Sequence, residues 1–435
     1  MKKVNLWNIQ NDVSEPACLL KWQWTSLYIM QQQASSCHRV EKENISIENF
    51  DDFHNTPGVL EARKKMLNGQ WPGKGCEYCK NIEEAGGLSD RQQINNKELS
   101  FERLTPKEFK EDSTAIHVTP STLEVFFSNL CNQACLYCFA KYSSKIEAEQ
   151  RRYNIIDTNP MSESDRNTAK TQLELVKNTK INYPKMKEKF WQWMRHNATN
   201  LKNYRILGGE PFFQPEIFEN IEFFKHYPCP DLNVNVFSNF NVEPQRVRKI
   251  LEEFKSLLDK KHIKSFRLLL SIDSWGPVEE YVRSGSNNII WKQNFDMLGY
   301  EFPMFKVKIL STLSNLNIKS SLGLIRIFNN STISENTHDN YHGFNLVGSN
   351  EHLQIGIFPK RFFDDDFDQM TQEIKMDNFK NQLQGYKRFA NSKPYRPDLI
   401  IILKKYLDQI DLRRNMNWKQ TFPWLDKFNP EDYKE

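Results

Sequence analysis

From about residue 120 onward, short runs of apolar residues alternate with stretches in which apolar residues recur every three or four positions. The short runs are typical of strands, and the longer spacing is typical of amphipathic helices. The expected strands are residues 123–127, 204–207, 232–237, 266–272, 305–310 and 353–358. Helix-like faces are formed by Phe190, Trp193 and Met194, and by Val247, Ile250, Leu251, Phe254 and Leu258. This alternation predicts an α/β fold with a parallel sheet, and six such units predict a partial (β/α)6 barrel of the TIM type.

Chemically distinctive residues follow the first four expected strands. They are the cysteine loop (residues 131–138, with Cys131, Cys135 and Cys138), the GGEP turn (Gly208-Gly209-Glu210-Pro211), the pair Ser238-Asn239, and Ser271 with Asp273. In a parallel barrel the carboxyl ends of the strands meet at one rim, where the active site gathers. We therefore expect these side chains to form one site.

The chain divides into three expected parts. Residues 1–115 form an N-terminal region with scattered cysteines, residues 116–360 the barrel, and residues 361–435 a mostly helical C-terminal extension whose strongest helix pattern spans 399–412. The polar segment 141–185 reads as an extended, partly mobile loop. The acidic run Asp364-Asp365-Asp366 reads as a solvated loop rather than a metal site.

Composition and charge give no sign of a nucleic-acid-binding, membrane-spanning or secreted protein. The 435 residues suffice for about two or three domains, and a net charge of +4 does not require a nucleic-acid partner. No apolar run approaches the roughly 20 residues that span a bilayer, and the sequence from Met1 to Trp7 lacks the apolar segment of a secretion signal. We expect a cytoplasmic protein without a membrane partner.

The eight cysteines fit metal ligands better than disulfides, because a reducing compartment keeps thiols free. The spacing CxxxCxxC of the cysteine loop can hold three irons of a four-iron cluster, which leaves one iron open to a small molecule. Zinc is the alternative, but it prefers four nitrogen or sulfur ligands. The loop offers three cysteines and no neighbouring histidine.

The cysteine loop closely resembles that of the radical S-adenosylmethionine superfamily, including the aromatic Tyr137 before the last cysteine. The resemblance implies a 4Fe-4S cluster on Cys131, Cys135 and Cys138, with S-adenosylmethionine on the open iron. One electron would then cleave the sulfonium to a 5'-deoxyadenosyl radical, which would abstract hydrogen from a substrate.

The GGEP turn is similar to the superfamily's second motif. Glycines let the backbone approach a ligand closely, and a carboxylate can accept a charge-assisted hydrogen bond from an ammonium. The resemblance implies that Gly208, Gly209 and Glu210 bind the methionyl amine and that Ser238 and Asn239 contact the ribose. Three further residues would complete the cofactor site: Ser271, Asp273 and Arg283, with Arg283 as partner of the methionyl carboxylate.

The N-terminal quartet (Cys18, Cys37, Cys76 and Cys79), followed by residues 83–91, resembles the auxiliary-cluster region of twitch-domain radical enzymes. Further similarity runs through Ser143-Ser144-Lys145, Phe190-Trp191-Gln192-Trp193 and Phe422-Pro423-Trp424-Leu425. A second 4Fe-4S cluster is favoured, with structural zinc as the alternative, and His38 is an alternative ligand. Cys229 reads as an ordinary thiol.

The predicted function is a radical S-adenosylmethionine enzyme that oxidises, or forms a bond in, a sugar, nucleotide or other small metabolite. A flavodoxin- or ferredoxin-type protein would donate the electron. The alternatives are a maturase of ribosomally made peptides and, from another class, a zinc-binding interaction module with a degenerate barrel.

Overall fold

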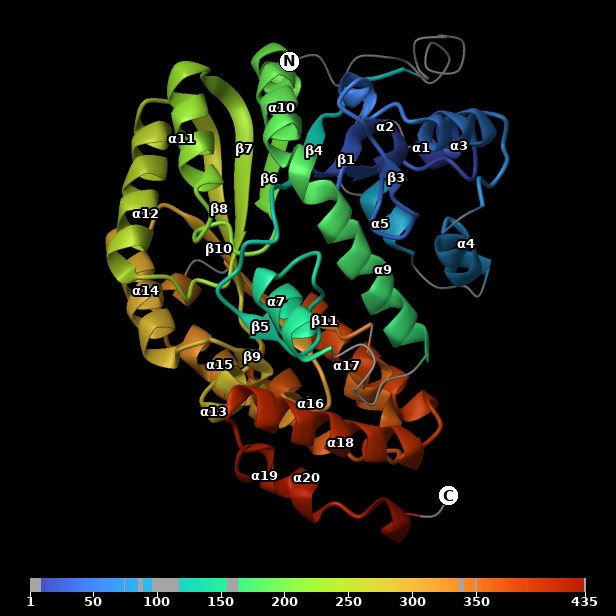
Figure 1. Ribbon diagram of the computed structural model, residues 1–435, viewed down its shortest axis with the longest axis vertical. Coiled ribbons are helices and arrows are strands. Elements are labelled where there is room, and N and C mark those ends of the chain that lie inside the picture. The colour runs from blue at the N-terminus through green and yellow to red at the C-terminus, as the bar shows by residue number, and fades with distance from the viewer. Residues whose placement is uncertain are drawn as a thin grey trace.

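The computed structural model describes residues 9–73, 75–84, 89–95, 117–154, 163–335, 340–348 and 350–433. The strands are β1 (Trp24–Tyr28), β2 (Gln33–Ser35), β3 (Glu43–Asn44), β4 (Thr122–Phe126), β5 (Ala134–Cys135), β6 (Asn203–Leu207), β7 (Cys229–Ser238), β8 (Ile263–Ser271), β9 (Arg283–Ser284), β10 (Lys306–Leu313) and β11 (Tyr341–Leu346). Nine of them form one sheet, in the order β11-β10-β8-β7-β6-β4-β1-β2-β3 (Figure 1). Neighbours from β11 to β1 run parallel. The α/β class with a large parallel sheet is confirmed, and the curvature of a partial barrel stays a prediction.

Helices connect and cover the strands. Those of the first part are α1 (Ile9–Asp12), α2 (Leu20–Gln23), α3 (Pro57–Leu67), α4 (Glu77–Glu84) and α5 (Asp90–Asn95). Those between the parallel strands are α7 (Ser144–Tyr153), α9 (Glu163–Thr179), α10 (Tyr183–Asn197), α11 (Glu216–His226), α12 (Pro244–Asp259), α13 (Pro277–Val282), α14 (Asn288–Glu301) and α15 (Ile318–Asn329). The last are α16 (Asp364–Glu373), α17 (Asp377–Ser392), α18 (Pro397–Arg414), α19 (Trp418–Thr421) and α20 (Pro423–Lys427). Short 3-10 helices are η1 (Phe50–Asp52), η3 (Lys180–Asn182), η4 (Ala198–Asn200), η5 (Thr332–Glu335), η6 (Glu351–Leu353), η7 (Ile355–Ile357) and η8 (Pro430–Asp432).

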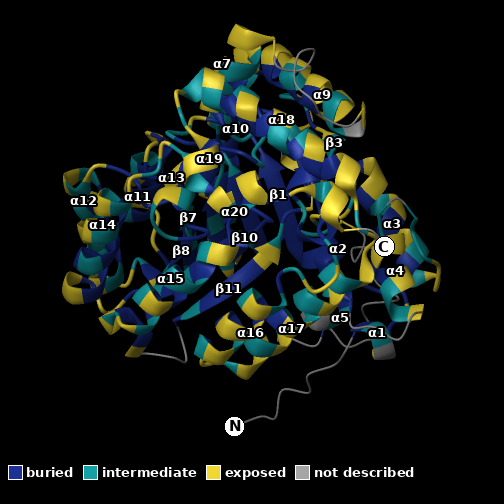
Figure 2. Cartoon of the chain, turned by 90° about the horizontal axis from the view of Figure 1, so that it is seen from below, coloured by how far each residue is buried: buried dark blue, intermediate teal, exposed yellow. Residues whose placement is uncertain are grey.

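The core lies between the sheet and its helices, where Figure 2 shows most of the buried residues. Helix α12 illustrates the cause, because Val247, Ile250, Leu251 and Phe254 are all buried and share one face at helical spacing. Phe254 stacks on Phe266 of β8 with 4.0 Å between ring centres. The amphipathic pattern read from the sequence therefore sets which face of the helix meets the sheet.

The sixth expected strand was placed wrongly. Residues 353–358 lie in and after the short helices η6 and η7, and the last parallel strand is β11 instead. Leu353, Ile355 and Ile357 are buried in the cluster around α18 rather than in the sheet. A short apolar run buries equally well against helices, so its pattern alone does not distinguish the two.

Two segments expected to be loops are helical. Within 141–185 the chain forms α7 and α9; the Ser143 side chain accepts a hydrogen bond from the Ile146 amide and caps the start of α7, and residues 155–162 lie outside the described part. The acidic run forms the first turn of α16, where carboxylates favour the helix dipole. Asp366 also lies 3.1 Å from the Lys319 ammonium. In contrast, the helix expected at 399–412 is confirmed as α18.

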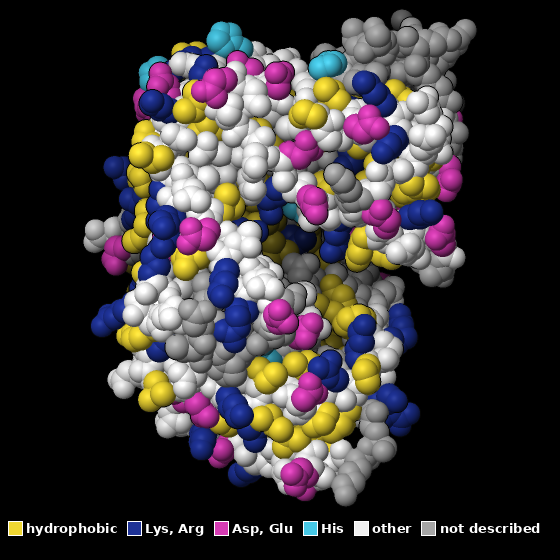
Figure 3. Space-filling view, turned by 45° about the vertical axis from the view of Figure 1, so that its right-hand side comes forward, with side chains coloured by type: hydrophobic (Ala, Val, Ile, Leu, Met, Phe, Trp, Pro, Cys, Tyr) yellow, Lys and Arg dark blue, Asp and Glu magenta, His cyan; other side chains and the backbone are white. Residues whose placement is uncertain are grey.

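The N-terminal region joins the sheet directly, because β1 pairs in parallel with β4 along its whole length. The expected boundary at 115 and 116 lies outside the described residues, so the three-part division stays a prediction. None of the helices in the described ranges is both long and apolar enough to cross a membrane. On the face seen in Figure 3, acidic and basic side chains are interspersed.

Candidate functional site

Most of the residues expected at the site line one pocket of about 360 Å³ at the carboxyl ends of the parallel strands, here named the strand-end pocket. It contains Cys131, Cys135, Tyr137, Cys138, Gly208, Gly209, Glu210, Ser238, Asn239, Ser271 and Arg283. Asp273 is fully buried and stands behind Tyr137, whose hydroxyl donates to it. The convergence follows from the parallel topology, since each loop leaves its strand at the same edge of the sheet.

The cysteine loop is held by a small second sheet. Strand β5 pairs antiparallel with β9, so that Cys135 lies opposite Arg283, and the Leu136 amide donates to the Val282 carbonyl at 2.9 Å. All three thiols are free, and burial raises the pKa of Cys131 to about 12. Buried thiols lose their protons when a metal binds them. Three cysteines facing one pocket are therefore a donor set suited to an iron-sulfur cluster.

Glu210 is a buried carboxylate that is held by hydrogen bonds, and burial raises its pKa by more than the charge of Arg283 lowers it. Its side chain is 1% exposed and accepts from the Phe212 amide at 2.9 Å, the Ser238 hydroxyl at 2.7 Å and the Asn239 amide at 2.5 Å. No ion pair to it is found among the described residues, and burial raises its pKa to about 7. A ligand ammonium would supply the charge that this buried carboxylate needs.

The GGEP turn packs directly against the start of the cysteine loop. The Gly209 amide donates to the Ser128 carbonyl at 3.0 Å, and the Glu210 amide to the Leu130 carbonyl at 2.9 Å. A Cβ at Gly209 would stand 2.2 Å from the Leu130 oxygen, and Gly208 has φ +125°. Both glycines are therefore required by the close approach of the two loops.

Arg283 is already engaged by protein groups. Its guanidinium donates to the Tyr137 hydroxyl at 2.8 Å and lies 3.6 Å from Asp273 and 3.5 Å from Glu279. Burial and the Asp273 charge raise the pKa of Glu279. This network fixes the aromatic residue of the cysteine loop, so Arg283 holds the loop in place whether or not it also contacts a ligand.

The N-terminal quartet forms a second group of thiols. Cys18, Cys37, Cys76 and Cys79 line one small pocket together with Lys21, Arg39, Asp90 and Arg91. Gly75 has φ +91°, and a Cβ there would stand 2.3 Å from the Arg39 oxygen. Glycine thus lets the Cys76 segment approach the Cys37 segment. Of the motif at 83–91, residues 85–88 lie outside the described part.

Helix α5 ties the Cys18 segment to this pocket. Arg91 is 3% exposed, donates to the Ala17 carbonyl at 2.9 Å and pairs with Glu83. Asn95 accepts from the Leu19 amide at 3.0 Å. His38 does not line the pocket; its Nε2 lies 3.5 Å from Glu124. The structure therefore brings the four cysteines together at one pocket, and His38 as an alternative ligand stays a prediction.

Several residues of the strand-end pocket were not expected from the sequence. They are Phe126, Gln133, Tyr142, Leu207, Phe237, Leu310, Thr312 and Asn345. Asn345 is near the end of β11, and the misplacement of the sixth strand hid it. Thr312 is near the end of β10, so its position after an apolar run was a usable signal.

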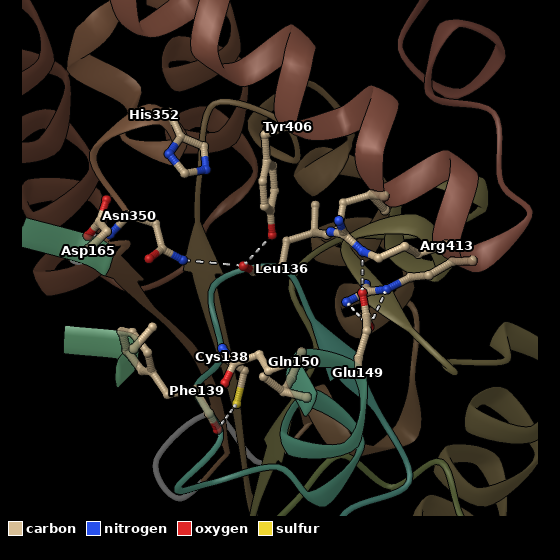
Figure 4. Close-up of a pocket in the computed structure, with 14 residues that line it drawn as sticks. Leu136, Cys138, Phe139, Glu149, Gln150, Asp165, Asn350, His352, Tyr406 and Arg413 are labelled. Atoms are coloured by element: carbon tan, nitrogen blue, oxygen red, sulfur yellow. Dashed lines mark hydrogen bonds and ion pairs between the residues drawn. The ribbon is translucent and has the colours of Figure 1, made fainter. Parts of the chain in front are cut away.

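A second cavity, of about 60 Å³, lies behind the cysteine loop. Figure 4 shows Tyr406 and Asn350 pointing at the Leu136 carbonyl, to which they donate at 3.1 and 3.3 Å. Glu149 lies 2.9 Å from Arg413 and 2.8 Å from Arg414. Because Cys138 lines both cavities, α18 packs against the back of the loop whose front faces the strand-end pocket.

Within the described ranges, no three His, Cys, Asp or Glu side chains are gathered so as to hold a metal ion. The ligands of a four-iron cluster bind different irons, so the fit of such a cluster rests on the donor set that faces each pocket.

No protein-family model matches the chain, and no curated protein matches it. Among solved structures it is similar to the crystal structure of Streptococcus suis SuiB bound to S-adenosylmethionine, at 12% identity and a TM-score of 0.34. That match covers 90% of this chain and 68% of the other. A likeness of this level decides neither the fold nor the activity, for which the geometry above is the basis.

Proposed function

We propose that this chain is a radical S-adenosylmethionine enzyme. The observation that supports the proposal is the shared opening of Cys131, Cys135, Cys138 and Glu210 onto the strand-end pocket. Three thiols there suit three irons of a 4Fe-4S cluster. A buried carboxylate that forms no ion pair within the described part of the chain suits the methionyl ammonium. When bound, the cluster and S-adenosylmethionine would supply reductive cleavage of the sulfonium and abstraction of hydrogen from a substrate C–H bond.

The chain's own residues bind and orient the cofactor. Ser238 and Asn239 hold the Glu210 carboxylate by hydrogen bonds at 2.7 and 2.5 Å, which fixes the direction in which it receives an ammonium. Gly208 and Gly209 hold the GGEP turn against the cysteine loop. Tyr137 is anchored by Arg283 at 2.8 Å and by Asp273. Phe126, Phe237 and Leu310 line the same pocket and would keep water from the reacting groups.

The N-terminal quartet is proposed to hold a second 4Fe-4S cluster. Four thiols line its pocket, and a cysteine-only donor set is the usual one for such clusters. Zinc with four cysteines is the alternative at this site. A second cluster could accept an electron from the substrate, which is consistent with a net oxidation or bond-forming reaction on a small metabolite. A flavodoxin- or ferredoxin-type protein would supply the first electron.

Anaerobic reconstitution tests the proposal. The expected result is about eight irons per chain and release of 5'-deoxyadenosine from S-adenosylmethionine after reduction. Cys135→Ala is expected to abolish that release. Cys229→Ala is the matched control, because this buried cysteine lies outside both thiol pockets. Zinc without cleavage in the wild-type chain would overturn the proposal and favour a zinc-binding module.

A further inference from the structure

Two lysines from distant parts of the chain meet beside the strand-end pocket. Lys42 immediately precedes β3, and Lys141 follows the cysteine loop. Lys42 donates its Nζ to the Tyr142 hydroxyl at 3.5 Å, and the Lys141 Nζ lies 4.9 Å from the centre of the Tyr142 ring. Tyr142 itself lines the strand-end pocket, so the two ammonium groups flank a residue of the proposed site.

Neither lysine is paired with a carboxylate among the described residues, although the charge of a Cys138 thiolate raises the pKa of Lys141. Both lysines are half-buried, and neither forms an ion pair there. Glu124 is the nearby carboxylate, but it accepts from Ser26 at 2.6 Å and pairs with Arg205 at 3.4 Å. Burial raises the pKa of Tyr142 to about 12, so the tyrosine stays neutral. Burial, followed by the charge of Lys42, lowers the pKa of Lys141 to about 7.

Nevertheless, the surrounding structure holds the lysines in place. Gln31 is 2% exposed, and its amide donates to the Lys141 carbonyl at 2.6 Å. The Lys42 Nζ lies 4.5 Å from the centre of the Tyr28 ring, a cation–π contact. Placing two like charges together in a partly buried position costs free energy. Such an arrangement is a candidate functional site when it borders a pocket.

Lys42 also borders a further pocket, of about 370 Å³, which reaches Cys76 of the N-terminal quartet. Lys21 and Lys65 line this pocket, as do three carboxylates, those of Glu41, Glu43 and Glu61. Lys42 thus borders a pocket that reaches the N-terminal quartet, and Tyr142 beside it lines the strand-end pocket. A molecule held there by one end could reach the strand-end pocket with the other.

We propose that Lys42 and Lys141 together bind an anionic group, a phosphate or a carboxylate, of the substrate. This inference rests on the proposed function and narrows it, because it names a negatively charged metabolite as the substrate class. The bound anion would favour the protonated form of Lys141, pair with both ammonium groups and orient the remainder of the substrate along Tyr142 toward the strand-end pocket.

Anion titration of the full reconstituted chain tests this inference. Inorganic phosphate and acetate are added separately at constant ionic strength, and binding is followed by calorimetry. We expect one of the two anions to bind, and Lys42→Gln and Lys141→Gln each to weaken that binding on the order of tenfold or more. Tighter binding of phosphate would indicate a phosphorylated substrate, and tighter binding of acetate a carboxylate. Lys64→Gln, an exposed lysine on α3, is the control and should bind as the wild type does.

The outcomes separate the two proposals. If the wild type binds neither anion, or if both glutamine variants bind as tightly as the wild type, the lysine site is overturned. Thermal unfolding checks that each variant is folded, and Lys141→Arg, which keeps the charge, should retain binding if Lys141→Gln fails to fold. Iron content and cleavage of S-adenosylmethionine are measured on the same wild-type sample. A sample that holds no iron and cleaves no S-adenosylmethionine, but still binds the anion through the two lysines, would overturn the enzyme proposal. The proposal of an anion site would then stand on its own.

Discussion

Tyr406 donates its hydroxyl to the backbone carbonyl of Leu136, with 3.1 Å between the two oxygens. This bond joins α18 to the cysteine loop across 270 residues of sequence. The same carbonyl accepts from Asn350 at 3.3 Å, and Arg414 donates to the Ala134 carbonyl at 2.8 Å. The C-terminal helix therefore positions the backbone between the cysteines.

We predict that Tyr406→Phe loosens the cysteine loop without removing a ligand. Loss of one buried hydrogen bond should lower the free energy of unfolding by about 1 kcal/mol. The reconstituted variant should also release iron to a chelator faster than the wild type. Tyr433→Phe, on a side chain that is 43% exposed, is the control. Equal rates of iron release from Tyr406→Phe and the wild type would contradict a positioning role.

Glu210→Gln should weaken binding of S-adenosylmethionine on the order of tenfold or more, because a charge-assisted contact becomes a neutral one. The amide also places an NH2 group opposite one of the backbone amides that Glu210 now accepts from. Iron content should remain at the wild-type level, which separates loss of the ligand contact from loss of the cluster. Calorimetric titration and iron analysis give the two readings. Glu222→Gln, on the exposed side of α11, controls for general loss of charge.

The same carboxylate predicts a pH dependence. Burial raises the pKa of Glu210 to about 7 in the ligand-free chain, and only the ionised form attracts an ammonium. Affinity for S-adenosylmethionine should therefore fall as the pH is lowered through about 7. In Glu210→Gln this part of the pH dependence should disappear. If affinity changes equally with pH in the variant and the wild type, Glu210 is not the group responsible.

Gly209→Ala should separate the GGEP turn from the cysteine loop. The added Cβ would meet the Leu130 oxygen at 2.2 Å, and relief of that overlap needs a backbone shift that costs about 1–3 kcal/mol. We expect a lower midpoint of thermal unfolding together with reduced iron content. Gly348→Ala, where no atom lies within 4 Å of the added carbon, should change neither. A normal midpoint in Gly209→Ala would show that the loops can separate at no cost.

The parts of the site that depend on local order were predictable from the sequence. The cysteine spacing and the GGEP turn lie directly after strands β4 and β6, and parallel topology alone brings those two ends together. Five of the six expected strands are confirmed, because a strand is also indicated by the local order of its residues. The local pattern did not identify Asn345 as a residue of the pocket. It lies in β11 (Tyr341–Leu346), a strand that contains glycine and has a weaker apolar pattern than residues 353–358, where the sixth strand was expected.

Contacts between distant segments could not be read from the sequence. Arg283 meets Cys135 only through the β5 and β9 pairing, and Lys42 meets Lys141 only because β1 joins the sheet beside β4. Neither pairing has a local sequence signal, since each depends on how separate segments pack. Similarly, the polar segment 141–185 looked like a loop because its helices bury few of their residues, among them Ile146 and Val176.

Cys76→Ala should distinguish the metals of the N-terminal quartet. If that pocket holds a second 4Fe-4S cluster, losing one of four thiolates should reduce the iron content by about half. If it holds zinc, the variant should lose zinc while its iron content stays at the wild-type level. Elemental analysis of the purified variant beside Cys229→Ala gives the answer. Wild-type amounts of both metals in Cys76→Ala would exclude it as a ligand of either.

His342 should make the fold less stable in acid. Its ring is buried, lies 2.7 Å from the Ser311 hydroxyl and stacks on Phe344, and burial lowers its pKa from 6.5 to about 3. The unfolded chain therefore takes up a proton between these values that the folded chain refuses. Stability from this group is full above about pH 6.5 and falls as the pH drops toward 3, by up to about 1.4 kcal/mol per pH unit. Urea unfolding at pH 7.5 and 5.0 should show a smaller loss of stability in His342→Asn than in the wild type. His196→Asn, at an exposed position of α10, is the control. An equal loss in wild type and His342→Asn would mean that His342 does not contribute to the acid sensitivity.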